Sequence, residues 1–359
     1  MSKLKIAVIG CGYWGRNLIR NFSALDEVEL KAVCDFDLTA LARIKRNYPT
    51  VDLKPSYQDV VNDPRIDAIV IATPVSTHYP FARTALLAGK HVLVEKPLAT
   101  STSQVLDLIE LAEKQSKVLM VDHTFLYTDA VRRVKSLIEA GEIGDLLYFD
   151  AVRISLGLVQ SEINVLWDLG AHDFSILSFL CGRDPVSITA TGRKHLGHPF
   201  ESLAYVLADF DDNLIAHFHL NWLAPVKVRR ILIGGSKKMI VYDDMENCEK
   251  VRVYDKVISM NHDPEHRERL LTGYRSGDML APNLDTGEAL RCMAQEFVQS
   301  IRDKRAPLSD GYSGYRVVRL LEAAQRSMEM DGRPVELGAS AISPLGTFSP
   351  LAEFGVLDQ

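Results

Sequence analysis

Ile6-Ala-Val-Ile-Gly10-Cys-Gly12-Tyr-Trp-Gly15 is the stretch that decides the fold of this chain. Its four apolar residues are typical of a buried strand, and the spacing G-x-G-x-x-G follows at once, before a helical pattern. Gly10 allows a tight turn, Gly12 lets a pyrophosphate approach the backbone, and Gly15 lets the helix pack closely on the strand. The N-terminus of that helix would present unpaired N–H groups to the phosphates. The stretch therefore predicts a dinucleotide-binding α/β unit.

An acidic residue at the end of the next predicted strand indicates which dinucleotide is bound. Asp35 lies twenty residues after Gly15, where its carboxylate can accept hydrogen bonds from the adenosine ribose hydroxyls. A 2′-phosphate would meet the like charge of Asp35, and Asp37 adds to that repulsion. We therefore expect NAD rather than NADP. Trp14 is expected to pack beside the cofactor pyrophosphate or to be buried against a second domain. The residues of this region expected to contact the cofactor are Gly10, Gly12, Tyr13, Trp14, Gly15 and Asp35.

Up to residue 122, short apolar runs alternate with helical segments, a pattern typical of a parallel sheet covered by helices. The predicted strands are 5–9, 30–35, 68–72, 91–94 and 118–121. The predicted helices are 14–24, 39–47, 77–87 and 103–115, and Gly89 is a natural residue to follow the third. The pattern predicts a Rossmann dinucleotide-binding domain over residues 1–122.

Beyond residue 122 the strands follow one another with few helices between them, which favours a mainly antiparallel sheet. The predicted strands are 146–154, 187–192, 205–209, 215–222, 228–234, 239–242 and 250–254. The predicted helices are 129–140, 171–180, 290–303 and 312–330. We therefore predict a second α/β domain over residues 123–338 and a C-terminal tail over 339–359.

Size and composition limit the class of protein. A chain of 359 residues suggests two domains, and 47% hydrophobic with 25% charged residues is ordinary for a globular enzyme. The net charge of −6, without a basic stripe, argues against a nucleic-acid surface. We see neither a signal peptide nor a membrane-length apolar run, and five scattered cysteines form no C-x-x-C pair. We expect a cytoplasmic protein with reduced thiols and no membrane contact.

A second stretch, Gly89-Lys-His-Val-Leu-Val-Glu-Lys-Pro97, places a lysine where a proton-transfer group would have to lie. Its apolar run ends at Val94, so Glu95 and Lys96 emerge at the carboxyl end of the strand, where open α/β sheets bind ligands. Pro97 ends the strand and could form a cis peptide bond that fixes the direction of the Lys96 side chain. For an isolated Glu-Lys-Pro the alternative is a surface lysine in a loop, but the dinucleotide motif favours proton transfer.

Asp168 and His172 are four residues apart at the start of a predicted helix and can share one helical face. A carboxylate can fix the imidazole tautomer, and the imidazole can exchange protons with a substrate hydroxyl near neutral pH. Alone, such a pair would more often be an N-cap aspartate and a packed histidine. The lysine and the dinucleotide motif favour the functional interpretation.

Two further pairs alternate along predicted strands, so each pair shares one face. Lys227 and Arg229 could pair with a nucleotide pyrophosphate, or could lie at a sheet edge or an interface. His217 and His219 lack a third ligand nearby, and we therefore expect no metal site.

Four segments together resemble the glucose–fructose oxidoreductase, inositol dehydrogenase and rhizopine-catabolism (Gfo/Idh/MocA) oxidoreductase family. They are residues 10–15, Ala72-Thr-Pro-Val-Ser-Thr-His78, residues 89–97 and Asp168-Leu-Gly-Ala-His172, and the resemblance spans residues 4–338. It implies a Rossmann domain followed by a substrate-binding α/β domain with an open antiparallel sheet, whose outer face forms homodimer or homotetramer contacts. It also implies that Lys96 is the principal proton-transfer residue and that Asp168 and His172 line the reacting hydroxyl. The implied border of the cofactor is Thr73, Pro74, His78, Glu95, Lys96 and Pro97.

A narrower resemblance is to a group that includes bacterial enzymes acting at C3 of UDP-N-acetylglucosamine or its uronic acid. It rests on Gly12-Tyr-Trp-Gly-Arg-Asn17, His123-Thr-Phe-Leu-Tyr127 and the segment from Asn164 to Leu177. Many relatives carry asparagine or arginine near position 123, where this chain has Asp122-His123. His123 is therefore either an extra proton carrier or a buried structural histidine. The expected substrate contacts are His123, Tyr127, Trp167, Lys227 and Arg229.

Together these features predict NAD-dependent hydride transfer between a secondary alcohol of a sugar and nicotinamide, with Lys96 as the acid/base. The alternatives are an inositol or free-sugar dehydrogenase, a non-catalytic NAD-binding regulator, and an enzyme that uses NAD transiently to cleave glycosidic bonds. The tail is too apolar for a typical linker, so it either docks on the second domain or a neighbouring subunit, or is a frayed end.

Overall fold

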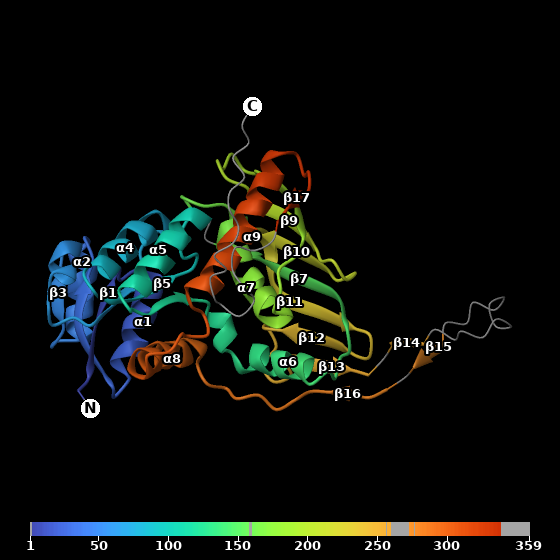
Figure 1. Ribbon diagram of the computed structural model, residues 1–359, viewed down its shortest axis with the longest axis horizontal. Helices are drawn as coiled ribbons and strands as arrows, with labels where there is room; N and C mark the ends of the chain where they lie inside the picture. Colours follow the sequence, from blue (N-terminus) through green and yellow to red (C-terminus); the bar gives the residue numbers. More distant parts are fainter. Residues whose placement is uncertain (1, 158–159, 256, 260–272, 276, 339–359) are drawn as a thin grey trace.

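The computed structural model describes residues 2–157, 160–255, 257–259, 273–275 and 277–338. Two large sheets organise this part of the chain, one in each half, with helices packed against both (Figure 1). The predicted fold class is confirmed: a parallel sheet comes first, and a mainly antiparallel sheet follows. The predicted docking of residues 339–359 lies outside the described residues.

The N-terminal sheet is parallel and has the strand order β3-β2-β1-β4-β5-β6. Its central strands are buried along their whole apolar runs, because helices cover both faces. The strands are β1 (Leu4–Ile9), β2 (Val28–Cys34), β3 (Asp52–Lys54), β4 (Ala68–Ile71), β5 (His91–Glu95) and β6 (Leu119–Asp122). Edge strand β3 and the short helix after it were not predicted, since Asp52–Lys54 has no apolar run.

Apart from the unpredicted α3, the α-helices of this half agree with the predicted segments to within one or two residues. They are α1 (Tyr13–Ser23), α2 (Leu38–Asn47), α3 (Tyr57–Val61), α4 (His78–Leu87) and α5 (Thr102–Lys114), with a 3₁₀ turn η1 (Val75–Thr77). Asp37 caps α2 and Ser101 caps α5 through their side-chain oxygens, which explains where these helices begin. Gly89, with φ of +72°, follows α4 as expected.

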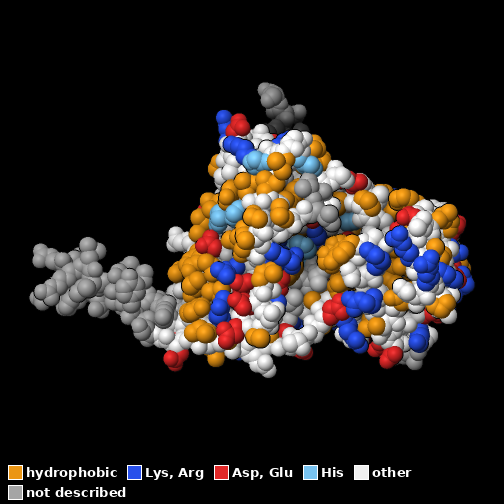
Figure 2. Space-filling model, turned by 180° about the vertical axis from the view of Figure 1, so that it is seen from behind, with side chains coloured by type: hydrophobic (Ala, Val, Ile, Leu, Met, Phe, Trp, Pro, Cys, Tyr) orange, Lys and Arg blue, Asp and Glu red, His pale blue; other side chains and the backbone are white. Residues whose placement is uncertain are grey.

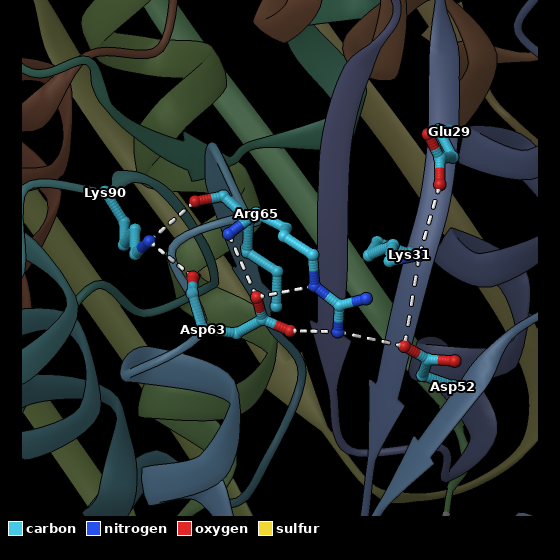
Figure 3. A network of polar contacts seen from close by, with 7 residues as sticks. Glu29, Lys31, Asp52, Asp63, Arg65 and Lys90 are labelled. Carbon is cyan, nitrogen blue, oxygen red and sulfur yellow. Dashed lines mark hydrogen bonds and ion pairs between the residues drawn. The ribbon is translucent and has the colours of Figure 1, made fainter.

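At the outer edge of this sheet, charged side chains fasten the short strand β3 to the turn that precedes β4 (Figure 3). Arg65 Nη2 lies 2.6 Å from an Asp63 oxygen and 3.3 Å from an Asp52 oxygen. Lys90 Nζ donates to the carbonyl oxygens of Asp63 and Ile66, at 2.8 and 2.7 Å. The network stabilises the turn that leads into β4. This turn lies at the end of the sheet opposite the carboxyl ends of the strands.

The second sheet has nine strands in the order β16-β13-β12-β11-β7-β10-β9-β8-β17. Its neighbours are antiparallel except β7 and β10, which are parallel. Buried and accessible residues alternate along β9 and β10, so one face packs on helices and the other is open. The strands are β7 (Leu146–Leu156), β8 (Ser187–Arg193), β9 (Leu203–Asp209), β10 (Ile215–Asn221), β11 (Leu223–Gly235), β12 (Met239–Asp243), β13 (Val251–Tyr254), β16 (Met279–Leu280) and β17 (Val335–Glu336), while β14 (Val257–Ser259) and β15 (Gly273–Arg275) pair separately.

The helices of the second half join the two sheets. Phe22 of α1 meets Phe297 of α8 edge to face at 6.2 Å, so α8 packs on the Rossmann half. Helix α9 places Tyr315 and Val318 in the same apolar cluster as α5, and Leu321 in the cluster beneath the second sheet. The elements are η2 (Thr124–Tyr127), α6 (Asp129–Glu139), the π-helical turn η3 (Leu166–Gly170), α7 (Ala171–Cys181), α8 (Ala289–Asp303) and α9 (Gly311–Glu329).

Candidate active site

The glycine loop has the shape that a dinucleotide requires. Gly10 has φ of +88°, and a Cβ there would lie 2.4 Å from Ala72 O. A Cβ on Gly15 would lie 2.0 Å from Gly10 O, so α1 and the loop pack too closely for a side chain. A Cβ on Gly12 would meet no atom within 4 Å, and no side chain caps α1. The open space at Gly12 and the uncapped helix end fit a bound pyrophosphate.

Asp35 lies against this loop at the end of β2. Its Oδ2 accepts a hydrogen bond from Cys11 N at 2.8 Å, and its Oδ1 accepts one from Asp37 N at 2.9 Å. Burial opposes ionisation, but these hydrogen bonds hold the pKa of Asp35 below its usual range. The carboxylate is therefore charged at neutral pH, and its contact with the ribose of NAD stays a prediction. The Asp37 carboxylate accepts hydrogen bonds from Thr39 N and Ala40 N at the start of α2.

Trp14 is not buried against the second half of the chain, and that alternative is wrong. Its ring is 45% exposed and meets Tyr13, which is 67% exposed, edge to face at 5.2 Å. Both side chains leave the first turn of α1 beside Gly12, so a contact with the cofactor stays a prediction for both.

His78 is buried, and its ring nitrogens lie against backbone carbonyls. Nδ1 lies 2.8 Å from Pro97 O, and Nε2 lies 2.9 Å from Thr73 O. Burial lowers the pKa of His78. The imidazole therefore links the loop after β4 to the loop after β5, instead of offering a free nitrogen to the cofactor. Thr73 and Pro74 lie in the first of these loops, where Thr77 Oγ1 contacts both.

Lys96 follows β5, and the Lys96–Pro97 peptide bond is cis, as predicted. Lys96 Nζ donates hydrogen bonds to Asp168 O at 2.7 Å and to Asp168 Oδ1 at 3.0 Å. The other carboxylate oxygen, Oδ2, accepts one from Trp222 Nε1 at 3.1 Å. Both oxygens of Asp168 are thus engaged, and the lysine is held at the boundary between the two halves of the chain.

The predicted partnership between Asp168 and His172 is corrected by this geometry. Asp168 lies inside the π-helical turn η3, is not an N-cap, and bonds to Lys96 and Trp222 instead of the imidazole. Asn164 Oδ1, which accepts from Trp167 N at 3.1 Å, supplies the capping contact at this turn. Among the described residues, neither ring nitrogen of His172 has a hydrogen-bond partner. Burial and the charge of Lys96 lower the pKa of His172, so the imidazole is neutral at pH 7.

Glu95 and Asp122 form a buried carboxyl pair that the sequence analysis missed. They are register partners at the ends of β5 and β6, and both side chains are buried. Burial and the neighbouring carboxyl group raise the pKa of Glu95, and burial raises that of Asp122. Burial therefore favours the protonated forms of these two carboxyl groups, whereas the nearby charge of Lys96 opposes it. The signal was available, because both residues end adjacent apolar runs.

Two of the expected substrate contacts are buried. Both ring nitrogens of His123 lack a partner among the described residues, and burial, then the charge of Lys96, lowers its pKa to about 3. His123 is therefore a buried neutral histidine, which favours the structural alternative. Tyr127 is 2% exposed, and its hydroxyl bonds to Ser309 at 2.8 Å. Tyr127 thus joins η2 to the segment before α9, and its hydroxyl is engaged by Ser309.

The other expected contacts differ in their surroundings. Trp167 is partly buried and packs on both apolar clusters, whereas Lys227 is exposed. Arg229 lies 5.9 Å from the ring centre of Phe125, which meets His172 edge to face at 5.1 Å. Arg229 therefore lies near His172. This position argues against the alternative that Arg229 lies only at a sheet edge or at an interface.

The arrangement can bind a dinucleotide at the glycine loop and exchange a proton at Lys96. Figure 2 shows a hollow between the two lobes, with Lys or Arg and His side chains visible in it. Within the described residues, no group of three His, Cys, Asp or Glu side chains is placed to hold a metal. No described helix has the length and apolar character needed to cross a bilayer.

Comparison with known proteins agrees with this geometry. Residues 4–123 match the model "Oxidoreductase family, NAD-binding Rossmann fold", and residues 131–241 match the "GFO/IDH/MocA C-terminal domain". The UDP-N-acetylglucosamine 3-dehydrogenase of Acidithiobacillus ferrooxidans is 26% identical over 326 residues, which are 89% of this chain and 95% of that protein. The solved structure of the enzyme of that name from this organism, GnnA, has a TM-score of 0.78 at 24% identity, covering 92% of this chain and 99% of that one.

A further match covers a smaller share of the other protein. The "Glycosyl hydrolase family 109 protein 2" of Shewanella sp. (strain ANA-3) is 32% identical over 163 residues, which are 43% of this chain and only 36% of that protein. Because models of one family match both halves in succession, the chain belongs to the Gfo/Idh/MocA family of oxidoreductases, with an NAD-binding Rossmann domain.

Proposed function

We propose that this chain is an NAD-dependent dehydrogenase that oxidises a secondary hydroxyl of a nucleotide sugar, at C3 of UDP-N-acetylglucosamine or its uronate. The position of Lys96 carries the proposal: its Nζ is held at 2.7 and 3.0 Å by Asp168, at the carboxyl end of β5. The 26% identity to a UDP-N-acetylglucosamine 3-dehydrogenase along almost the whole chain supports this substrate class.

Lys96 acts on the substrate hydroxyl. In the oxidative direction the ammonium of Lys96 first releases a proton to solvent, and the resulting amine takes the hydroxyl proton as the C–H bond breaks and a ketone forms. Bound NAD supplies the hydride acceptor. The ammonium that results lies 3.0 Å from Asp168 Oδ1, which stabilises its charge. In the reverse direction the same ammonium returns the proton to the new alkoxide.

Asp168 and His172 have separate roles in this mechanism. Asp168 serves the lysine, because Lys96 and Trp222 occupy both of its oxygens. His172 is neutral and has no hydrogen-bond partner in the described part of the chain, so it can donate a hydrogen bond to the reacting oxygen without adding a charge. The two side chains position the hydroxyl and keep Nζ aimed at it.

Replacing Lys96 by methionine tests the proposal. Lys96→Met should lower turnover by about 10²–10⁴-fold, since general acid–base groups typically contribute that much. The dissociation constant of NAD, measured by titration, should change little. Lys114→Met, at an exposed position near the end of α5, is the control and should retain full activity. Retention of more than about a tenth of the activity by Lys96→Met would contradict the assigned role.

A second candidate, cleavage of a glycosidic bond with transient use of NAD, is favoured by the match to a glycosyl hydrolase family 109 protein. Product mass separates the two: a dehydrogenase product has lost two hydrogens, whereas a hydrolase yields two fragments. An inositol or free-sugar dehydrogenase would oxidise those compounds and leave nucleotide sugars unchanged.

A further inference from the structure

Arg229 lies on the inner face of the second sheet, at the end nearest His172. Buried Ile231 and Ile233 share its face of β11, because side chains alternate along a strand. The adjacent Arg230 points to the opposite face, where it donates two hydrogen bonds to Asp243, at 2.9 and 2.7 Å. The two neighbouring arginines therefore face different environments.

Phe125 connects Arg229 to the candidate active site. Its ring centre lies 5.1 Å from that of His172 and 5.9 Å from the guanidinium carbon of Arg229. The guanidinium is thus within about 11 Å of the imidazole centre, the sum of those two distances. One sugar ring with its substituents can span this gap. A group bound by Arg229 would belong to the sugar whose hydroxyl meets His172.

The charges around Arg229 do not cancel. Arg153, its register partner on β7, is neutralised by Asp173, with hydrogen bonds of 3.0 and 2.6 Å. Arg229 instead shares Asp244 with Lys250, at 3.3 and 3.2 Å. Two cations thus face one carboxylate, and 35% of the Arg229 side chain is exposed. The neutral His172 adds no charge. Among the described residues, the cations Arg229 and Lys250 therefore exceed their shared carboxylate by one positive charge.

We infer that Arg229 binds a carboxylate on the substrate sugar, so that the chain acts on an anionic sugar in preference to its neutral counterpart. The inference rests on the proposed function and specifies its substrate class. A planar guanidinium matches a carboxylate through two parallel N–H···O bonds, and the ion pair with Asp244 uses only one of its nitrogens. A hydroxymethyl group at the same ring carbon offers neither the charge nor the paired acceptors.

Calorimetric titration in the presence of NAD tests the inference with two ligands that differ only at C6. UDP-N-acetylglucosaminuronate carries a carboxylate there, and UDP-N-acetylglucosamine a hydroxymethyl group. The wild-type chain should bind the uronate about 10-fold or more tightly than the neutral sugar. Arg229→Gln should reduce this preference to about 3-fold or less, and Arg229→Lys should retain part of it. Arg230→Gln, the matched control, should retain the full preference because its guanidinium lies on the other face.

Three results of the titrations with the two sugars would overturn the inference. They are equal affinity of the wild-type chain for the two sugars, no binding of the uronate, or an undiminished preference in an Arg229→Gln variant whose melting temperature is unchanged. UDP alone is titrated as a third ligand. If Arg229→Gln weakens the binding of UDP as much as that of the uronate, the arginine binds the diphosphate and the inference also fails. Binding is measured without turnover. An Arg229-dependent preference without NAD reduction would therefore contradict the proposed dehydrogenase and leave the carboxylate contact intact.

Discussion

Replacing Arg153 by methionine should destabilise the second half of the chain, because it leaves the carboxylate of Asp173 buried without a counter-ion. The two side chains are only 6% and 2% exposed. Arg153 Nε and Nη2 both donate to Asp173 Oδ1, and no other described residue hydrogen-bonds to that carboxylate. Methionine keeps an unbranched aliphatic side chain, although it also loses the guanidinium that lies 4.5 Å from the ring centre of Phe125. The change therefore removes mainly the charge and its hydrogen bonds.

Breaking a buried ion pair by removing one partner costs about 3–5 kcal/mol. For a domain of roughly 200 residues this corresponds to a fall in Tm of about 6–20 °C. Removing both charges, in Arg153→Met/Asp173→Leu, should recover much of the loss, since no unpaired charge then remains.

Differential scanning calorimetry of the ligand-free protein measures this effect, with circular dichroism to check the fold. Arg20→Met is the control: Arg20 also makes two hydrogen bonds to one carboxylate, that of Glu288, but the side chains are 52% and 42% exposed. Water can replace that pair, so Tm should change far less than in Arg153→Met. A Tm of Arg153→Met within about 2 °C of the wild type, less than 1 kcal/mol on this scale, would refute the reasoning.

Three other changes test separate parts of the chain. Asp35→Ala should narrow the preference for NAD over NADP and also weaken NAD binding, because it removes the negative charge and the acceptor of the Cys11 N–H. An unchanged ratio of the dissociation constants of NAD and NADP, measured at matched salt, would contradict this. His123→Leu should flatten the fall in stability as the pH drops from about 6.5 toward about 3, where the unfolded imidazole binds a proton and the buried one does not. Urea unfolding at pH 7 and pH 5 measures that slope, and an unchanged slope would exclude His123 as its source. Tyr205→Arg, on the open sheet face where Tyr205 stacks on His219 at 4.6 Å, should lower the oligomer mass in light scattering, whereas an unchanged mass would place the subunit contact elsewhere.

Local sequence patterns were sufficient for most of the fold. The runs at β1, β4 and β5 are apolar throughout because both faces of a parallel sheet are covered, and residue type alone reveals this. The strands of the second sheet were recognised from their β-rich apolar runs and turn signals. Strand β3 was missed, since Asp52–Lys54 is a strand only through its pairing with β2. The parallel pairing of β7 with β10 likewise depends on two segments that are distant in the sequence.

The residues of the candidate site also divide into those that the sequence predicted and those whose partners it did not reveal. The glycine loop, Asp35 and the cis peptide bond at Pro97 were predicted, because each depends on neighbours close in sequence or on the geometry of one residue type. His78 and Tyr127 were assigned to ligands and proved to bond to protein groups instead. Residue type shows that such a side chain can form hydrogen bonds, but it does not show which partner the fold brings to it.

The sequence by itself determined the dinucleotide loop and the lysine at the end of β5, since these follow from short-range sterics and strand direction. It also indicated the family, through the resemblance of its motifs. Only the tertiary structure decided which residue Asp168 serves. The four-residue spacing to His172 favoured a local pair, whereas the π-helical turn places the carboxylate against Lys96, 72 residues away, and Trp222, 54 residues away. Contacts between such distant positions form only when the two sheets pack together, and charge complementarity at the Lys96 ammonium then selects the partner.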